Sequence, residues 1–149
     1  MSEPANDEDR LRRLVSAPTG NWDPVALRAG ALICITFAVP FRLLAAALGD
    51  QGALDIVFFL VFLACFVVGA GTASWVQRCG TPMSHALVTA AGTFIAVEAV
   101  FVAVRLVRGT EVPWLAIMFT LTIVVMAGLV GGFLGNRLHA RGAVPSIWR

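Results

Sequence analysis

The chain has 149 residues, of which 58% are hydrophobic and 13% are charged, and its formal net charge is +2. Charged residues make up about 25% of an average soluble domain, so this composition excludes an ordinary soluble fold. The positive charge is too small and too dispersed for a nucleic-acid-binding protein. All eleven basic residues are arginine, a usage that we associate with GC-rich bacterial genomes. The sequence therefore predicts a bacterial membrane protein that does not bind nucleic acid.

The first 24 residues are polar and lack the short apolar stretch and small-residue cleavage site of a removable signal peptide. Residues 7–15 carry opposite charges four positions apart, and their apolar side chains fall on one helical face. This pattern predicts a short helix at the membrane interface, with a disordered acidic tail as the alternative. We expect residues 1–24 to form a cytoplasmic N-terminal segment.

Four later stretches are each long and apolar enough to cross a bilayer as an α-helix, which takes about 20 residues. They cover approximately residues 27–48, 54–76, 85–106 and 113–136, and short polar or Gly/Pro-containing connectors separate them. The predicted fold is all-α, a four-helix transmembrane bundle with short loops over residues 25–137. Residues 138–149 then form a cytoplasmic C-terminal tail.

The distribution of arginine predicts that both termini lie in the cytoplasm, because basic loops are retained on that side of the membrane. In this orientation Arg105 and Arg108 lie outside and Arg42 lies within the membrane. All the other arginines then face the cytoplasm: Arg10, Arg12, Arg13, Arg28, Arg78, Arg137, Arg141 and Arg149. We therefore expect a multi-pass protein of the bacterial plasma membrane.

The two halves of the predicted bundle also suggest a duplicated helix pair, a common origin of membrane folds. A shift of 62 residues overlays the first pair of stretches on the second without gaps. The positions that then coincide are Ala29/Ala91, Gly30/Gly92, Ile33/Ile95, Val68/Val130, Gly69/Gly131 and Gly80/Gly142. Because several identities arise by chance in so apolar a sequence, two unrelated helix pairs are the alternative.

Small residues at helical spacing form the strongest local pattern. Helices in lipid associate through close approach of their backbones, so such residues mark contact faces. The third stretch carries Gly92 and Ala96 at this spacing. The candidate helix-packing residues of the second and fourth stretches are Gly69, Ala73, Gly128, Gly131, Gly132 and Gly135. These faces either pack inside one bundle, or form the contact of a homo-oligomer or a closely lined pore.

Arg42 and Glu98 are the two ionisable residues that lie well inside predicted spans. A charge in the bilayer costs about 2.5 to 3.5 kcal/mol on insertion scales, so both are candidates for function. Both lie beyond the midpoints of their spans, toward the predicted outer face, at similar depths. They form either a structural intramembrane charge pair, with Arg42 alternatively snorkelling outward, or a proton or ion relay centred on Glu98.

Motifs of catalysis and metal binding are not found in the sequence. The three cysteines have no C-x-x-C spacing, and two of them lie within predicted spans. His85 and His139 fall at helix ends on the cytoplasmic side, where we expect them to be interfacial side chains. The sequence also lacks a phosphate-binding glycine loop and a G-x-S-x-G motif. We therefore expect no enzyme activity, no catalytic residues, no cofactor and no metal.

One segment carries a family resemblance: Gly69-Ala-Gly71, then Arg78, Gly80 and Pro82, then His85-Ala-Leu87. A glycine-rich helix end, a basic residue, a small loop and a helix that opens with histidine follow one another. This arrangement resembles small four-helix bacterial membrane proteins of unknown function, over approximately the first three spans. The resemblance implies a fold and no activity.

These observations favour a non-catalytic integral membrane protein, an accessory or scaffold-like subunit that acts through helix–helix contacts. Its expected partners are the lipid bilayer and either a second copy of the chain or a larger membrane complex. The alternative is a small dimeric transporter or channel in which Glu98 is the titrating site.

Overall fold

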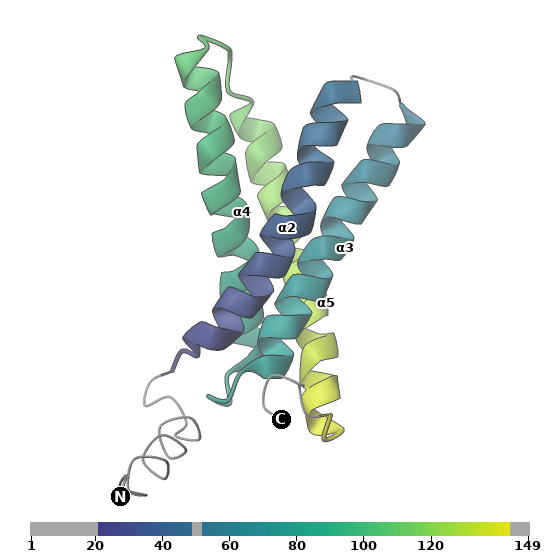
Figure 1. Ribbon diagram of the computed structural model, residues 1–149, viewed down its shortest axis with the longest axis vertical. Helices are drawn as coiled ribbons and strands as arrows, with labels where there is room; N and C mark the ends of the chain where they lie inside the picture. Colours follow the sequence, from purple (N-terminus) through teal and green to yellow (C-terminus); the bar gives the residue numbers. More distant parts are fainter. Residues whose placement is uncertain (1–20, 49–51, 144–149) are drawn as a thin grey trace, which may run out of the picture.

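The computed structural model describes residues 21–48 and 52–143, and this part of the chain forms four helices (Figure 1). They are α2 (Pro24–Leu48), α3 (Ala53–Val76), α4 (Pro82–Val107) and α5 (Trp114–Ala140). Each helix is long and apolar enough to cross a membrane, so the prediction of an all-helical fold with four spans is confirmed. The predicted interfacial helix at residues 7–15 lies outside the described residues.

The helix ends follow from local sequence. Before α2, the Asp23 side chain accepts the backbone N–H of Val25 at 3.1 Å, which caps the first turn. Proline opens α4 three residues earlier than the hydropathy indicated, since its fixed φ suits the first turn. At the other end of α4, Gly109 has a φ of 66° and the N–H of Thr110 bonds the carbonyl of Arg105 at 3.0 Å. This is a Schellman ending, and it turns the chain sharply toward α5.

The four helices form two hairpins, α2/α3 and α4/α5, that cross each other. Helix α3 packs against the other three helices, while α2 and α5 make no contact with each other in the described residues. Figure 1 shows the hairpins close together where α2 begins and α5 ends, which we call the basal end. They separate toward the α2–α3 and α4–α5 connections, which we call the open end.

The buried core changes character along this axis. Near the basal end its apolar part is rich in alanine, and Ala70, Ala73, Ala86 and Ala90 are fully buried. Where the hairpins cross, three phenylalanine rings fill the wider space. Phe62 lies 4.9 Å from Phe66 and 6.5 Å from Phe94, measured between ring centroids.

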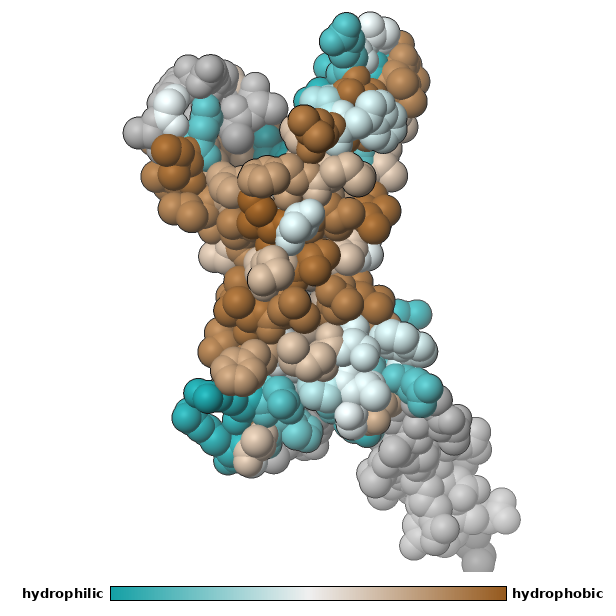
Figure 2. All heavy atoms as spheres, turned by 180° about the vertical axis from the view of Figure 1, so that it is seen from behind, coloured by the Kyte–Doolittle hydropathy of each residue, from teal (hydrophilic) through white to brown (hydrophobic). Residues whose placement is uncertain are grey.

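The outer surface is apolar around the middle of the molecule. Figure 2 shows this as a brown band on the face seen from behind, with hydrophilic residues gathered toward both ends. Large apolar side chains stand exposed along the helices, among them Leu32, Ile56, Val100 and Phe119. Water would not favour such a surface, whereas the hydrocarbon of a bilayer matches it.

Candidate functional site

Arg42 of α2 and Glu98 of α4 lie in contact in the open half of the bundle. The Nη2 atom of Arg42 is 2.9 Å from Oε2 and 3.1 Å from Oε1 of Glu98. Glu98 is 7% exposed, whereas the side chain of Arg42 is 34% exposed. The carboxylate is therefore enclosed and has its counter-charge beside it, and the guanidinium is the half of the pair that faces outward.

Aromatic rings surround the arginine. The guanidinium carbon lies 5.6 Å from the centroid of the Phe101 ring, within range of a cation–π interaction. A hollow of about 310 Å³ borders Arg42 and is lined by residues of α2, α3 and α4. Its lining consists of four phenylalanines and three charged residues: Phe41, Phe58, Phe59, Phe62, Arg42, Asp55 and Arg105. Glu98 is not part of that lining, so the hollow reaches the pair from the arginine side.

Gly131 and Gly135, which are four positions apart on α5, pack against α3. A Cβ atom added at Gly131 would collide with the backbone carbonyl of Val67 and lie 3.0 Å from the amide nitrogen of Gly71. One added at Gly135 would collide with the carbonyl of Gly71 and lie 3.0 Å from the Cβ of Ser74. These two glycines let the two backbones touch.

Gly128 and Gly132, also four positions apart on α5, pack against α4. A Cβ atom at Gly128 would lie 2.6 Å from the Cβ of Ala90, and one at Gly132 would lie 2.7 Å from the Cβ of Ala86. Real Cβ atoms do not approach so closely. Both glycine pairs of α5 therefore pack against other helices inside the bundle.

The small residues of α3 face α2 in the same way. A Cβ atom at Gly69 would collide with the sulfur of Cys34 and lie 2.7 Å from the carbonyl oxygen of Gly30. Ala73 is fully buried, and its Cβ would lie 2.8 Å from a Cβ added at Gly30. Gly30 was not among the packing residues predicted from sequence, although Ala26, four positions earlier on α2, gives it the same small-residue spacing.

Gly92 of α4 is different. Nothing lies within 4 Å of the position its Cβ would take. Ala96, Ala99 and Ala103, which follow it along the helix, are exposed as well. This small-residue face therefore points out of the bundle.

A buried polar cluster at the basal end was missed by the sequence analysis. His85 is 0% exposed and Asp23 is 1% exposed. The backbone N–H of Asp23 donates to Nε2 of His85 at 2.8 Å, so Nε2 must be unprotonated. The proton then sits on Nδ1, which donates to the backbone carbonyl of Thr81 at 2.8 Å. The expectation of an interfacial His85 is thus wrong, because the start of α2 covers the ring.

Further contacts close this cluster. The Trp22 ring lies 5.3 Å from the His85 ring, and the Thr81 hydroxyl donates to the carbonyl of Asn21 at 3.2 Å. Asp23 Oδ2 lies 3.6 Å from Nε of Arg78, which is long for a hydrogen bond. A signal for the cluster was present in the sequence, since polar Asp23 and His85 each stand at the beginning of an otherwise apolar helix.

The Cys79 thiol, which lies between α3 and α4, has a raised pKa. Loss of solvation raises the pKa of the Cys79 thiol above its ordinary value of 9.0, and the nearby Asp23 charge raises it further while Arg78 opposes them. A thiol with a raised pKa is a poor nucleophile at neutral pH. Across residues 21–48 and 52–143, no three histidine, cysteine or acidic side chains group as metal ligands would.

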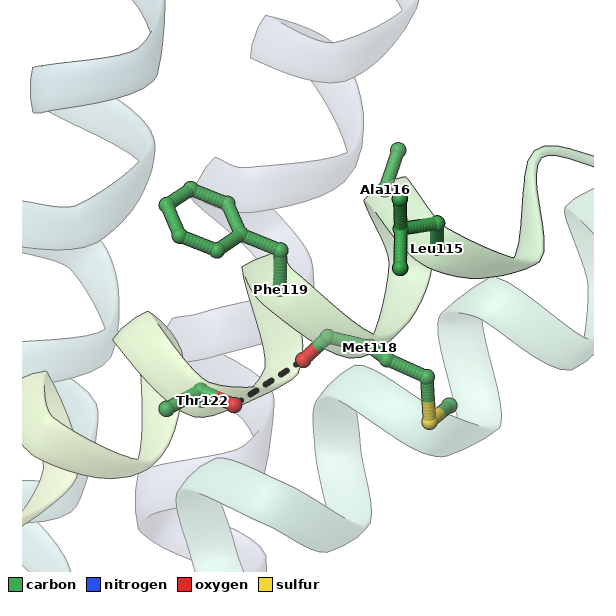
Figure 3. Close-up of a pocket in the computed structure, with 5 residues that line it drawn as sticks. All are labelled: Leu115, Ala116, Met118, Phe119 and Thr122. Atoms are coloured by element: carbon green, nitrogen blue, oxygen red, sulfur yellow. Dashed lines mark hydrogen bonds between the residues drawn. The ribbon is translucent and has the colours of Figure 1, made fainter.

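A shallow hollow of about 580 Å³ on α5 is lined by Leu115, Ala116, Met118, Phe119 and Thr122 (Figure 3). All five residues come from one helix, and the Thr122 hydroxyl donates to the carbonyl of Met118 at 3.0 Å. The polar group of this surface is therefore satisfied within its own helix. Such a face suits contact with lipid.

Comparison of the chain with family models, with curated proteins and with solved structures gives no match. The family resemblance drawn from the sequence remains a prediction. The segment on which it rests, residues 69–87, runs from the end of α3 into α4. Its Arg78 and His85 are members of the buried basal cluster.

Proposed function

We propose that the chain is a non-catalytic accessory protein of the bacterial plasma membrane, with both termini in the cytoplasm, that acts through lateral helix contacts. The observation that carries this proposal is Gly92. It is the one helical glycine within residues 21–48 and 52–143 whose Cβ position is open. The other helical glycines pack against neighbouring helices within the bundle, so the face that carries Gly92 is free to contact a partner helix.

The geometry of α4 supports such a contact. At about 100° per residue, Gly92, Ala96, Ala99 and Ala103 fall within about 60° of the helix circumference. They form a strip about 16 Å long, at a rise of 1.5 Å per residue. We call these four residues the α4 strip. A flat strip of this kind lets the backbone of a neighbouring helix approach closely in lipid. The neighbour is a second copy of the chain or another membrane protein.

The Arg42–Glu98 pair also favours this role. A carrier needs an ionisable site that exchanges protons or ions with water. Glu98 is enclosed, and both of its carboxylate oxygens lie within hydrogen-bonding distance of Arg42. Such a pair holds α2 against α4. It leaves no ionisable group free to exchange protons or ions with water, which is what we expect of a structural pair.

One observation favours the alternative of a small transporter or channel. The hollow beside Arg42 is bordered by the charged residues Asp55 and Arg105. If Arg42 moved into that hollow, Glu98 would be freed to take up a proton. In that case Glu98→Gln leaves folding intact and abolishes pH-dependent flux in reconstituted vesicles. The accessory role predicts that the wild-type protein shows no such flux.

Site-specific photo-crosslinking in native membranes tests the accessory role. A photoreactive residue at Ala99 should give one discrete protein adduct, which mass spectrometry assigns to a second copy or to another protein. The same residue at Phe119, on the exposed face of α5 drawn in Figure 3, is the matched control and should give none.

Gly92→Leu should remove the Ala99 adduct without changing the melting temperature of the purified protein, because the added side chain meets nothing inside the bundle. Absence of any adduct at Ala99, or equal adducts from both positions, would contradict the proposal.

A further inference from the structure

The separation of the hairpins leaves an apolar groove between α2 and α4 in the open half. Its volume is about 990 Å³. Ile35, Val39 and Leu43 line it on α2, and Val97, Val100 and Val104 line it on α4. The groove faces outward between the two helices, in the part of the molecule where Figure 1 shows that the distance between them increases.

The length of the groove matches one leaflet of a bilayer. From Ile35 to Leu43 the α2 wall rises about 12 Å, and from Ala96 to Arg108 the α4 wall rises about 18 Å. Half of the hydrocarbon core is about 15 Å thick. Ile35 lies near the middle of α2 and Arg108 is the C-cap of α4. The groove therefore runs from the centre of the membrane to its surface.

The surface end of the groove is cationic. Arg105 and Arg108 both line it, and both are exposed. Among the described residues, no acidic one is part of the lining. Arg105 donates one long hydrogen bond, to the carbonyl of Glu111 at 3.4 Å, and a guanidinium carries five N–H donors. Arg105 also borders the hollow that is lined by Asp55, whereas Arg108 does not. Arg108 is therefore the better residue for testing the charge of the groove.

We propose that this groove binds one anionic phospholipid, with an acyl chain along the valine and leucine walls and the phosphate between Arg105 and Arg108. Guanidinium groups match phosphate oxygens in both charge and geometry. An apolar partner helix would fill the walls equally well, but it would leave Arg108 at the surface end without an acidic partner among the described residues. The charge pattern therefore favours a lipid over a helix.

This site overlaps the proposed helix contact at Ala96 alone of the four residues of the α4 strip. Of the α4 strip, Ala96 borders the groove, whereas Gly92, Ala99 and Ala103 are not part of its lining. The lipid proposal therefore stands or falls independently of the accessory role.

Native mass spectrometry of the purified full-length protein tests the proposal. Phosphatidylglycerol should bind with a stoichiometry of one, and at least about tenfold more tightly than phosphatidylcholine with the same acyl chains. Arg108→Gln should reduce the affinity for phosphatidylglycerol about tenfold and leave that for phosphatidylcholine unchanged. Arg108→Lys should have an intermediate effect, because it keeps the charge and loses the planar fork.

Arg141→Gln is the matched control. Arg141 is also an exposed C-cap followed by a glycine of positive φ, but it ends α5 at the basal end. Its removal should not change lipid binding. Val100→Trp should weaken both lipids by filling the groove. Circular dichroism and the melting temperature without added lipid check that each variant is folded.

Four results would overturn the proposal. Equal affinity for the two lipids would mean that the groove holds ordinary annular lipid. Equal losses from Arg108→Gln and Arg141→Gln would mean that the cations act non-specifically. Displacement of phosphatidylglycerol by inorganic phosphate, or a co-purified polypeptide bound in place of the lipid, would assign the groove to a different occupant.

Discussion

The basal and open halves of the bundle are built from the same four helices but held together differently. In the basal half glycine and alanine bring backbones into contact, and the Ser74 hydroxyl donates to the carbonyl of Gly132 at 2.8 Å across the α3–α5 interface. Phenylalanine rings fill the space where the hairpins cross, and beyond them, in the open half, the hairpins separate and the Arg42–Glu98 pair joins α2 to α4. The size of the side chains between the helices thus decides how far apart the helices lie.

This difference matters because the helices are expected to lie in lipid and not in water. Lipid gives helices no hydrophobic reason to associate, so close packing and hydrogen bonds between helices must supply the attraction. The basal half provides many such contacts, and the open half provides few apart from one ion pair. We therefore expect the open half to depend on that pair and to offer the surfaces that bind other molecules.

The largest expected effect tests this dependence. Arg42→Leu strands the enclosed carboxylate of Glu98, and breaking a buried pair costs about 3 to 5 kcal/mol. We expect the lower end of that range, because the side chain of Arg42 is 34% exposed. Arg42→Leu combined with Glu98→Leu should be more stable than either single variant, since both charges are then gone. Thermal unfolding in detergent measures all three. Additive losses in the double variant would show that the two residues act separately.

A glycine substitution in the basal half should come next. Gly131→Leu places a side chain against the backbone of α3, which cannot move aside without separating two helices. Overpacking typically costs about 1 to 3 kcal/mol, and we expect the upper end. Gly92→Leu makes the same change on the α4 strip and should leave the free energy of unfolding nearly unchanged. If both variants unfold at the same temperature, the assignment of inner and outer glycine faces is wrong.

The smallest effect compares two hydroxyl groups. Ser74→Ala removes a buried hydrogen bond between α3 and α5, and leaves the carbonyl of Gly132 without that donor. The expected loss is about 1 kcal/mol. Thr122→Ala removes an exposed hydrogen bond within α5 and should cost less. Melting temperatures of the two variants in the same detergent give the comparison, and a larger loss for Thr122→Ala would contradict it.

Much of this fold could be predicted from the sequence, because hydropathy over about 20 residues is a local property. The four helices belong to this class. The similar depths of Arg42 and Glu98 likewise suggested that they could pair, and the structure places them in contact. The orientation in the membrane and the duplication of a helix pair remain predictions.

What the sequence could not separate is which faces meet. Gly92/Ala96 and Gly128/Gly132 have the same spacing, yet one step points outward and the other packs against α4. The burial of His85 was missed for a similar reason, since it depends on Asp23 of another helix. Such contacts are set by the crossing of the hairpins, which no single stretch of sequence encodes.

The hydrogen bond from Asp23 to His85 constrains the order in which the protein can be assembled. The two residues are 62 positions apart. At a synthesis rate of about 5 to 20 residues per second, the ribosome reaches His85 about 3 to 12 s after Asp23. During that interval α2 enters the membrane without the partner that later covers its first turn. The first hairpin must therefore wait at the translocation machinery or in the lipid beside it, and the basal end closes only when α4 is inserted.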